Sequence, residues 1–116
     1  MSKIEEFKAE RERLTNIVMK YAGLETKRFF SLDSQVYREG GALPVKIKEL
    51  LGLVASVVLR CDDCINYHLI RCFDEGLSDE ELEEALSISL IVGGSITIPH
   101  LRRAYDSWEE IKSAKD

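Results

Sequence analysis

Two cysteines and a histidine form the most reactive group of side chains in this sequence. Cys61, Cys64 and His68 follow one another at three- and four-residue spacing, so on a helix they share one side. Cβ atoms at that spacing lie about 5–6 Å apart, and a small adjustment in a first helical turn brings them to the roughly 3.8 Å that a disulfide needs. The pair is therefore predicted to cycle between dithiol and disulfide.

The surroundings of the pair act on its thiols in opposite directions. A helix N-terminus stabilises a thiolate, whereas the intervening Asp62 and Asp63 raise a thiol pKa. His68 lies one turn beyond Cys64 and is predicted to accept its proton. The spacing of His68 favours Cys64 as the attacking thiol, while the helix terminus favours Cys61 as the more exposed one.

The third cysteine and a metal site are the alternatives to be weighed. Cys72 follows His68 by four residues and is predicted to be a small buried hydrophobe. Zinc could use both cysteines of the pair, His68 and Cys72, but four ligands along one helix span three turns and cannot all converge on one ion. The sequence therefore predicts no metal and no other cofactor.

Length and charge exclude several functional classes. The chain has 116 residues, which suits one domain over 1–116, and a net charge of -5 without clustered basic residues. This balance argues against nucleic-acid or membrane binding as the main task. The N-terminus lacks the apolar stretch of a signal peptide, and the longest apolar run has ten residues, where a membrane span needs about 20. A cytoplasmic location is the expectation.

The elements that must position these residues are all helical. No segment alternates in the way a strand does, whereas apolar residues recur at helical spacing throughout. The pattern predicts a compact all-α bundle of about six helices, over about 4–22, 26–38, 44–59, 62–75, 78–93 and, from a start at 95 or 98, to 112.

Each predicted helix has an apolar side that needs a partner. The first two each show an apolar stripe, and the third, apolar nearly all round, is expected to be central. On the third helix, Glu49, Gly52, Ser56 and Arg60 form a polar stripe. That stripe is either a solvent-facing strip or a groove leading toward the cysteines. The third and fifth helices are too apolar for one small domain to cover, which predicts a homo-oligomer.

With Glu49 twelve positions before Cys61, the pattern of Cys61, Cys64 and His68 resembles the signature of one known family. This is the alkylhydroperoxidase D-like (AhpD-like) branch of the carboxymuconolactone decarboxylase family. The segments 41–44, 48–50 and 89–94 are also similar, and the likeness covers about residues 29–108. The resemblance implies an all-helical fold that assembles as trimers or hexamers.

The resemblance also implies an activity, which is reduction of hydroperoxides by the cysteine pair. An external dithiol, such as a lipoyl carrier or a thioredoxin-like protein, would then reduce the disulfide. By that likeness Glu49 is the general base, acting through His68 or a water. The chain departs from the well-characterised peroxidase at Asp63, where that enzyme has a second histidine. The decarboxylase branch lacks the cysteine pair, so decarboxylation is not implied.

Two matters stay open at the level of sequence. The alternatives to a peroxidase are a protein-disulfide reductase, a non-enzymatic helical oligomer with redox-sensing cysteines, and a metal-binding module. In a straight hairpin turning at Cys61, His68 would fall about 8 Å short of Glu49 along the axis. Contact between them requires crossed helices, an offset connection near Arg60, or a bridging water.

Overall fold

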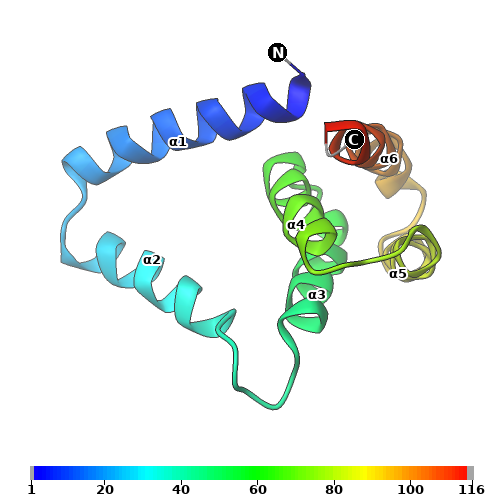
Figure 1. Ribbon diagram of the computed structural model, residues 1–116, viewed down its shortest axis with the longest axis horizontal. Helices are drawn as coiled ribbons and strands as arrows, with labels where there is room; N and C mark the ends of the chain where they lie inside the picture. The colour runs from blue at the N-terminus through cyan, green and yellow to red at the C-terminus, as the bar shows by residue number, and fades with distance from the viewer. Residues whose placement is uncertain (1, 115–116) are drawn as a thin grey trace.

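The computed structural model describes residues 2–114, and in this part of the chain every regular element is a helix (Figure 1). The fold class predicted from periodicity is therefore confirmed. The elements are α1 (Lys3–Tyr21), α2 (Leu24–Val36), α3 (Val45–Val58), α4 (Asp62–Asp74), α5 (Asp79–Gly93), a short 3-10 helix (Ser95–Thr97) and α6 (Ile98–Ala114).

Local signals in the sequence account for several helix ends. Ser78 and Glu81 form a reciprocal capping box at the start of α5, with the Ser78 hydroxyl 3.1 Å from the Glu81 amide nitrogen. Gly94, with a φ of 81°, ends the same helix because it adopts a left-handed conformation that disfavours other residues. Pro44 precedes the first turn of α3, where its fixed φ suits helix entry.

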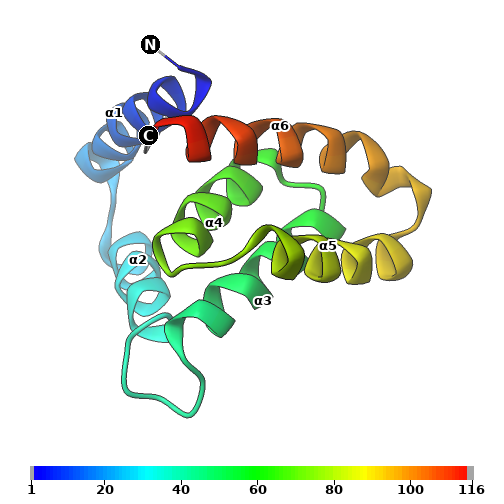
Figure 2. The same ribbon diagram turned by 45° about the vertical axis from the view of Figure 1, so that its right-hand side comes forward.

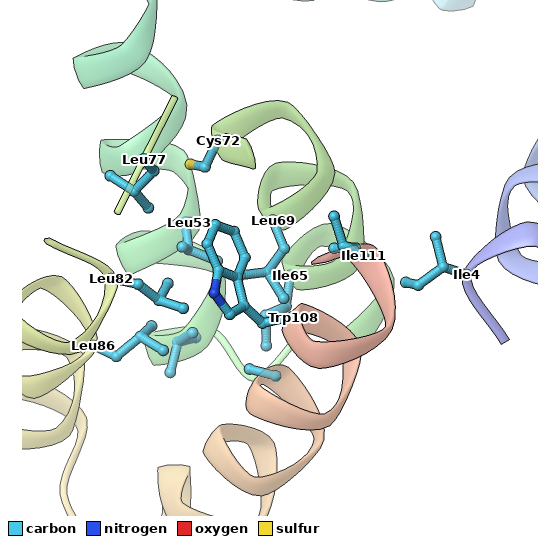
Figure 3. Close-up of a cluster of buried hydrophobic side chains, with 12 residues drawn as sticks. Ile4, Leu53, Ile65, Leu69, Cys72, Leu77, Leu82, Leu86, Trp108 and Ile111 are labelled. Carbon is cyan, nitrogen blue, oxygen red and sulfur yellow. The ribbon is translucent and has the colours of Figure 1, made fainter. Parts of the chain in front are cut away.

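The hydrophobic core lies between α3, α4, α5 and α6. Trp108 reaches from α6 into the middle of a cluster that includes the fully buried Leu53 of α3 and Leu69 of α4 (Figure 3). The Trp108 indole nitrogen donates a hydrogen bond to Asp79 at 2.8 Å, so the polar edge of this large side chain is satisfied. These four helices are therefore the scaffold on which any site is held.

Helices α1 and α2 form an arm that departs from this core (Figures 1 and 2). α1 is tied at its start, where Ile4 is buried and Lys3 pairs with Asp106 at 2.9 Å, while α2 buries none of its residues. Most of the apolar side chains of both helices are therefore uncovered within a single chain. The apolar side chains that the arm exposes are Leu14, Ile17, Val18, Tyr21, Leu24, Phe29, Phe30, Leu32 and Val36.

The connection between α3 and α4 is a tight left-handed turn. Arg60 has a φ of 60°, the Arg60 amide bonds to the Val57 carbonyl at 3.0 Å, and the Cys61 amide bonds to the Ser56 carbonyl at 3.1 Å. This pair of bonds is a Schellman motif, normally built around glycine. It starts α4 at an offset from the end of α3. Among residues 2–114, no helix is long and apolar enough to cross a membrane.

Candidate redox site

The first turn of α4 holds the cysteine pair. Cys61 is the N-cap of the helix, and its sulfur accepts a hydrogen bond from the Cys64 amide at 3.3 Å. The structure joins Cys61 and Cys64 by a disulfide, with their Cα atoms 5.3 Å apart. The close approach expected from the spacing is thus present, and the pair is held in its oxidised form.

The two cysteines differ in their access to solvent. Cys61 is half-buried because its backbone closes the turn from α3, whereas Cys64 is exposed. The interpretation that Cys61 is the more exposed cysteine is therefore wrong. Placing Cys61 at the cap directs its side chain back onto the helix end, and the next turn carries Cys64 outward.

Glu49 of α3 and His68 of α4 meet in the interior of the protein. The Glu49 carboxylate lies 2.8 Å from His68 Nδ1, and the residues are only 1% and 8% exposed. The contact between them is direct, so no bridging water is needed. The polar stripe of α3 is accordingly not a solvent-facing strip, because Glu49 and Ser56 are buried and only its end at Arg60 is exposed.

The second oxygen of Glu49 faces a cation. Arg71 Nε lies 3.7 Å from it, and the same guanidinium pairs with Asp74 at 3.5 Å and Glu75 at 3.3 Å. Partial burial pushes the pKa of Arg71 down, but the carboxylates of Glu49 and Glu75 outweigh that effect and raise it. A buried carboxylate is tolerated when it is paired. Glu49 therefore has a partner on each oxygen.

The contact with Glu49 sets the tautomer of His68. Because a carboxylate only accepts hydrogen bonds, Nδ1 carries the proton and Nε2 of the neutral ring is left as an acceptor. Two aromatic rings flank the imidazole, with centroid distances of 5.5 Å for Tyr37 and 5.3 Å for Tyr67. The ring is thus fixed in orientation, and its basic nitrogen is on the edge away from Glu49.

A small pocket of about 250 Å³ opens at this place. Its walls come from α1, α2 and α4, and its lining residues are Arg11, Asp33, Asp63, Cys64, Tyr67 and His68. The Arg11 guanidinium stacks over the Tyr67 ring at 4.2 Å from the centroid. A small substrate entering the pocket would meet Cys64 and the histidine together. Of these residues, Arg11, Asp33 and Tyr67 were not singled out by sequence reasoning.

The two aspartates between the cysteines have different environments. Asp62 binds His100 Nδ1 at 2.7 Å and Arg103 Nε at 2.8 Å, both on α6. Partial burial raises the pKa of Asp62, but these two hydrogen bonds and the charge of Arg103 outweigh it, and the pKa lies below its usual range. Asp63 is exposed in the pocket. Only one of the two charges expected to oppose a thiolate is therefore compensated.

Cys72 lies one helical turn beyond His68 on α4 but does not line the pocket. It is fully buried in the hydrophobic core, and burial raises the pKa of its thiol to about 12. Such a thiol is protonated and inert at neutral pH. No group of three or more His, Cys, Asp or Glu side chains that could hold a metal ion is found in residues 2–114.

Solved structures of similar proteins match nearly the whole chain. A Thermotoga maritima crystal structure matches with a TM-score of 0.92 and 59% identity, covering 96% of each chain. A second crystal structure of the same Thermotoga maritima protein, described as a carboxymuconolactone decarboxylase family protein with a suggested involvement in antioxidative response, matches with a TM-score of 0.89 and 60% identity, covering 95% of this chain and 92% of that one. A Legionella pneumophila member of that family gives 0.80 and 26%, covering 96% and 98%.

Sequence comparisons point the same way. The sequence model of the carboxymuconolactone decarboxylase family matches residues 25–107. An uncharacterised Cupriavidus necator protein is 34% identical over 56 residues, which is 48% of this chain and 50% of that protein. The chain thus spans about half the length of that relative. An uncharacterised protein of the cox locus of Paracoccus denitrificans is 27% identical over 86 residues, covering 74% and 77%.

Proposed function

Since this chain belongs to the carboxymuconolactone decarboxylase family, we propose that it is a thiol-dependent enzyme that reduces hydroperoxides through Cys61 and Cys64. One observation carries the proposal, namely the buried 2.8 Å contact between Glu49 and His68 at the base of the pocket that exposes Cys64. The suggested antioxidative involvement of the Thermotoga maritima relative is consistent with it.

In the proposed reaction the reduced pair is oxidised once per peroxide. His68 Nε2 takes the proton of the Cys64 thiol, and Glu49 balances the charge of the imidazolium that forms. The Cys64 thiolate attacks the terminal oxygen of the hydroperoxide, so an S–O bond forms and the O–O bond breaks. The departing alkoxide takes the proton from His68 and leaves as an alcohol.

The resulting sulfenic acid is resolved within the pair. The Cys61 thiol attacks the Cys64 sulfur, an S–S bond forms, and the hydroxyl leaves as water with the thiol proton. An external dithiol then restores the reduced pair through a mixed disulfide. Cys64 is the sulfur that such a reductant can reach, because it is exposed whereas Cys61 is half-buried. A lipoyl carrier or a thioredoxin-like protein would supply the dithiol, which fits a cytoplasmic location.

Peroxide consumption with dithiothreitol as reductant tests this function. We expect turnover in the wild type, loss in Cys64→Ser, and a fall of about 100-fold in Glu49→Gln, which keeps the shape but removes the charge that supports His68. Cys72→Ala is the matched control, because this cysteine is sealed in the core, and the folded variant is expected to keep its turnover. Unchanged turnover in Cys64→Ser would remove the pair from the mechanism.

We also propose that the protein works as a homo-oligomer. The arm exposes its apolar side, and a hollow of about 700 Å³ lies between α3 and α5, lined by apolar residues such as Leu51, Val54 and Ile88. Exposed apolar surface of this kind is typical of an interface. The family resemblance makes a trimer or a hexamer the expected assembly.

A further inference from the structure

The nitrogen of His68 that faces away from Glu49 has a neighbour outside the family signature. Tyr37 follows directly after α2 and is its C-cap. Every residue of α2 is exposed, whereas Tyr37 is half-buried with its ring 5.5 Å from that of His68. Tyr37 is thus the residue at the end of α2 that contacts the site.

The position of Gly52 limits the distance between the Tyr37 hydroxyl and His68 Nε2. A Cβ placed on Gly52 would lie 2.6 Å from the Tyr37 hydroxyl oxygen and 2.8 Å from His68 Nε2. Two atoms that both lie this near one point are separated by no more than the span of a single bridging water. The space left by the missing side chain of Gly52 is therefore where the phenol and the imidazole face each other.

The chemistry of the two groups is complementary. Neutral His68 presents a lone pair at Nε2, since Nδ1 is engaged by Glu49. Burial, and then the charge of Glu49, raises the pKa of Tyr37, which keeps its hydroxyl protonated at neutral pH. A phenol can donate one hydrogen bond and also accept one. It can therefore bond to Nε2 whether or not that nitrogen carries a proton.

We propose that Tyr37 is a positioning residue for His68, bonding to Nε2 directly or through one water on the edge opposite Glu49. Its hydroxyl donates to Nε2 of the neutral resting ring, must turn its proton away before Nε2 can take the Cys64 proton, and then accepts from Nε2–H. This assignment deepens the proposed function and rests on it for its purpose. The relay then runs through three helices, with Glu49 on α3, His68 on α4 and Tyr37 at the end of α2.

A hydrogen bond next to Tyr37 helps to hold Tyr37 against His68. Lys48 of α3 donates to the Arg38 carbonyl at 2.6 Å, which ties the residue after Tyr37 to the helix that carries Glu49. The charged groups around the imidazole and phenol stay the same in the variants tested below. These groups are Glu49, Arg71, Arg11, Asp33 and Asp63.

Nitrogen-15 spectra of protein labelled at histidine provide the test, because the chain has only two histidines. We expect Tyr37→Phe to move the Nε2 resonance of reduced His68, while His100, which bonds to Asp62 instead, remains unchanged as an internal standard. The pH midpoint of Cys64 alkylation should also rise, with a loss of about threefold in rate at pH 7. Tyr105→Phe on α6 is the matched control and should alter neither readout.

Gly52→Ala is the second variant. Its methyl carbon would lie 2.6 Å from the Tyr37 hydroxyl oxygen and 2.7 and 2.8 Å from His68 Cε1 and Nε2, so the phenol or the imidazole must shift and the same resonance should move. Alanine itself favours the helix. Adding Tyr37→Phe to Gly52→Ala should then cause no further change. An unmoved Nε2 resonance and an unmoved pH midpoint in Tyr37→Phe would overturn the assignment. Neither readout needs peroxide turnover, so failure of the peroxidase assay is a separate result.

Discussion

At the scale of single residues, Asp62 and Asp63 show how neighbours in sequence can act differently on one reaction. Asp62 is turned toward α6, where His100 and Arg103 offset its charge. Asp63 faces the pocket beside Cys64. We therefore expect Asp63 to be the carboxylate that opposes formation of the Cys64 thiolate.

Replacing Asp63 should make Cys64 more reactive. Asp63→Asn removes a like charge from the pocket, which lowers the cost of forming a thiolate, so we expect alkylation of the reduced protein at pH 7 to speed up about twofold to fivefold. The measurement is the rate of iodoacetamide labelling of Cys64. Glu80→Gln, the same change in the first turn of α5, is the control. A slower reaction in Asp63→Asn would contradict this interpretation.

Replacing Asp62 should instead change stability, in a way that depends on pH. Because its folded-state pKa is lowered, the Asp62 carboxylate stabilises the protein above its unfolded pKa, and this contribution is lost as pH falls through the folded value. We expect Asp62→Asn to lower the free energy of unfolding by about 1 kcal/mol at pH 7, a value kept small because solvent screens a side chain that is 44% exposed.

Urea unfolding at several pH values measures this effect. The difference between wild type and Asp62→Asn should be full at neutral pH and should shrink below about pH 4. Asp63→Asn provides the comparison and should show a smaller difference throughout. A difference in the free energy of unfolding that grows as the pH falls would contradict this prediction.

At the scale of elements, the positions of the helices could be predicted from the sequence, but what covers each apolar side could be predicted only in part. The six segments follow from periodicity and from caps such as Ser78 and Gly94, which are local effects. Periodicity shows that a helix has an apolar side but not what covers it. For this reason the sequence predicts the two helices of the arm but not that their apolar sides are uncovered within the chain.

The turn between α3 and α4 provides a prediction about local strain. Arg60 occupies a left-handed position that costs a residue with a Cβ about 1–2 kcal/mol, whereas the equivalent turn after α4 uses Gly76, with a φ of 85°. We expect Arg60→Gly to raise the free energy of unfolding by about 0.5–1 kcal/mol after the extra chain entropy of glycine is counted. Urea unfolding in a fixed redox state measures it.

Two further variants serve as controls for the expected stabilisation by Arg60→Gly. Arg60→Ala keeps a Cβ in the left-handed position and should bring no gain. Gly76→Ala has open space around it, so it should lose about 1 kcal/mol through backbone conformation alone. A gain in Arg60→Ala equal to that in Arg60→Gly would assign the effect to the arginine side chain instead of the backbone.

At the scale of the whole molecule, the site divides into a part that local spacing predicts and a part that only the fold assembles. Cys61, Cys64 and His68 are one helical turn apart, so their proximity follows from the sequence. The groups that complete the site lie far away along the chain. Arg103 reaches Asp62 across 41 residues, and Tyr37 and Arg11 arrive on the arm. No periodicity encodes such contacts.

The uncovered surface predicts association in solution. Light scattering at micromolar concentration should give a mass of several chains, because exposed apolar area on this scale is stabilised by burial. Ile88→Glu places a charge in the hollow between α3 and α5 and should reduce the mass. Ser113→Glu, at the exposed end of α6, should not. A wild-type mass equal to one chain would exclude the homo-oligomer.

The offset turn at Arg60 also bears on how this chemistry can be recognised in other genomes. Glu49 and His68 are 19 residues apart, and the turn between their helices is short and held by backbone hydrogen bonds. One residue inserted or deleted there would rotate α4 by about 100° relative to α3 and carry the imidazole off the carboxylate. The interval from Glu49 to His68 should therefore tolerate substitution but no change in length. An alignment gap within it would mark a relative that has kept the fold and lost the relay.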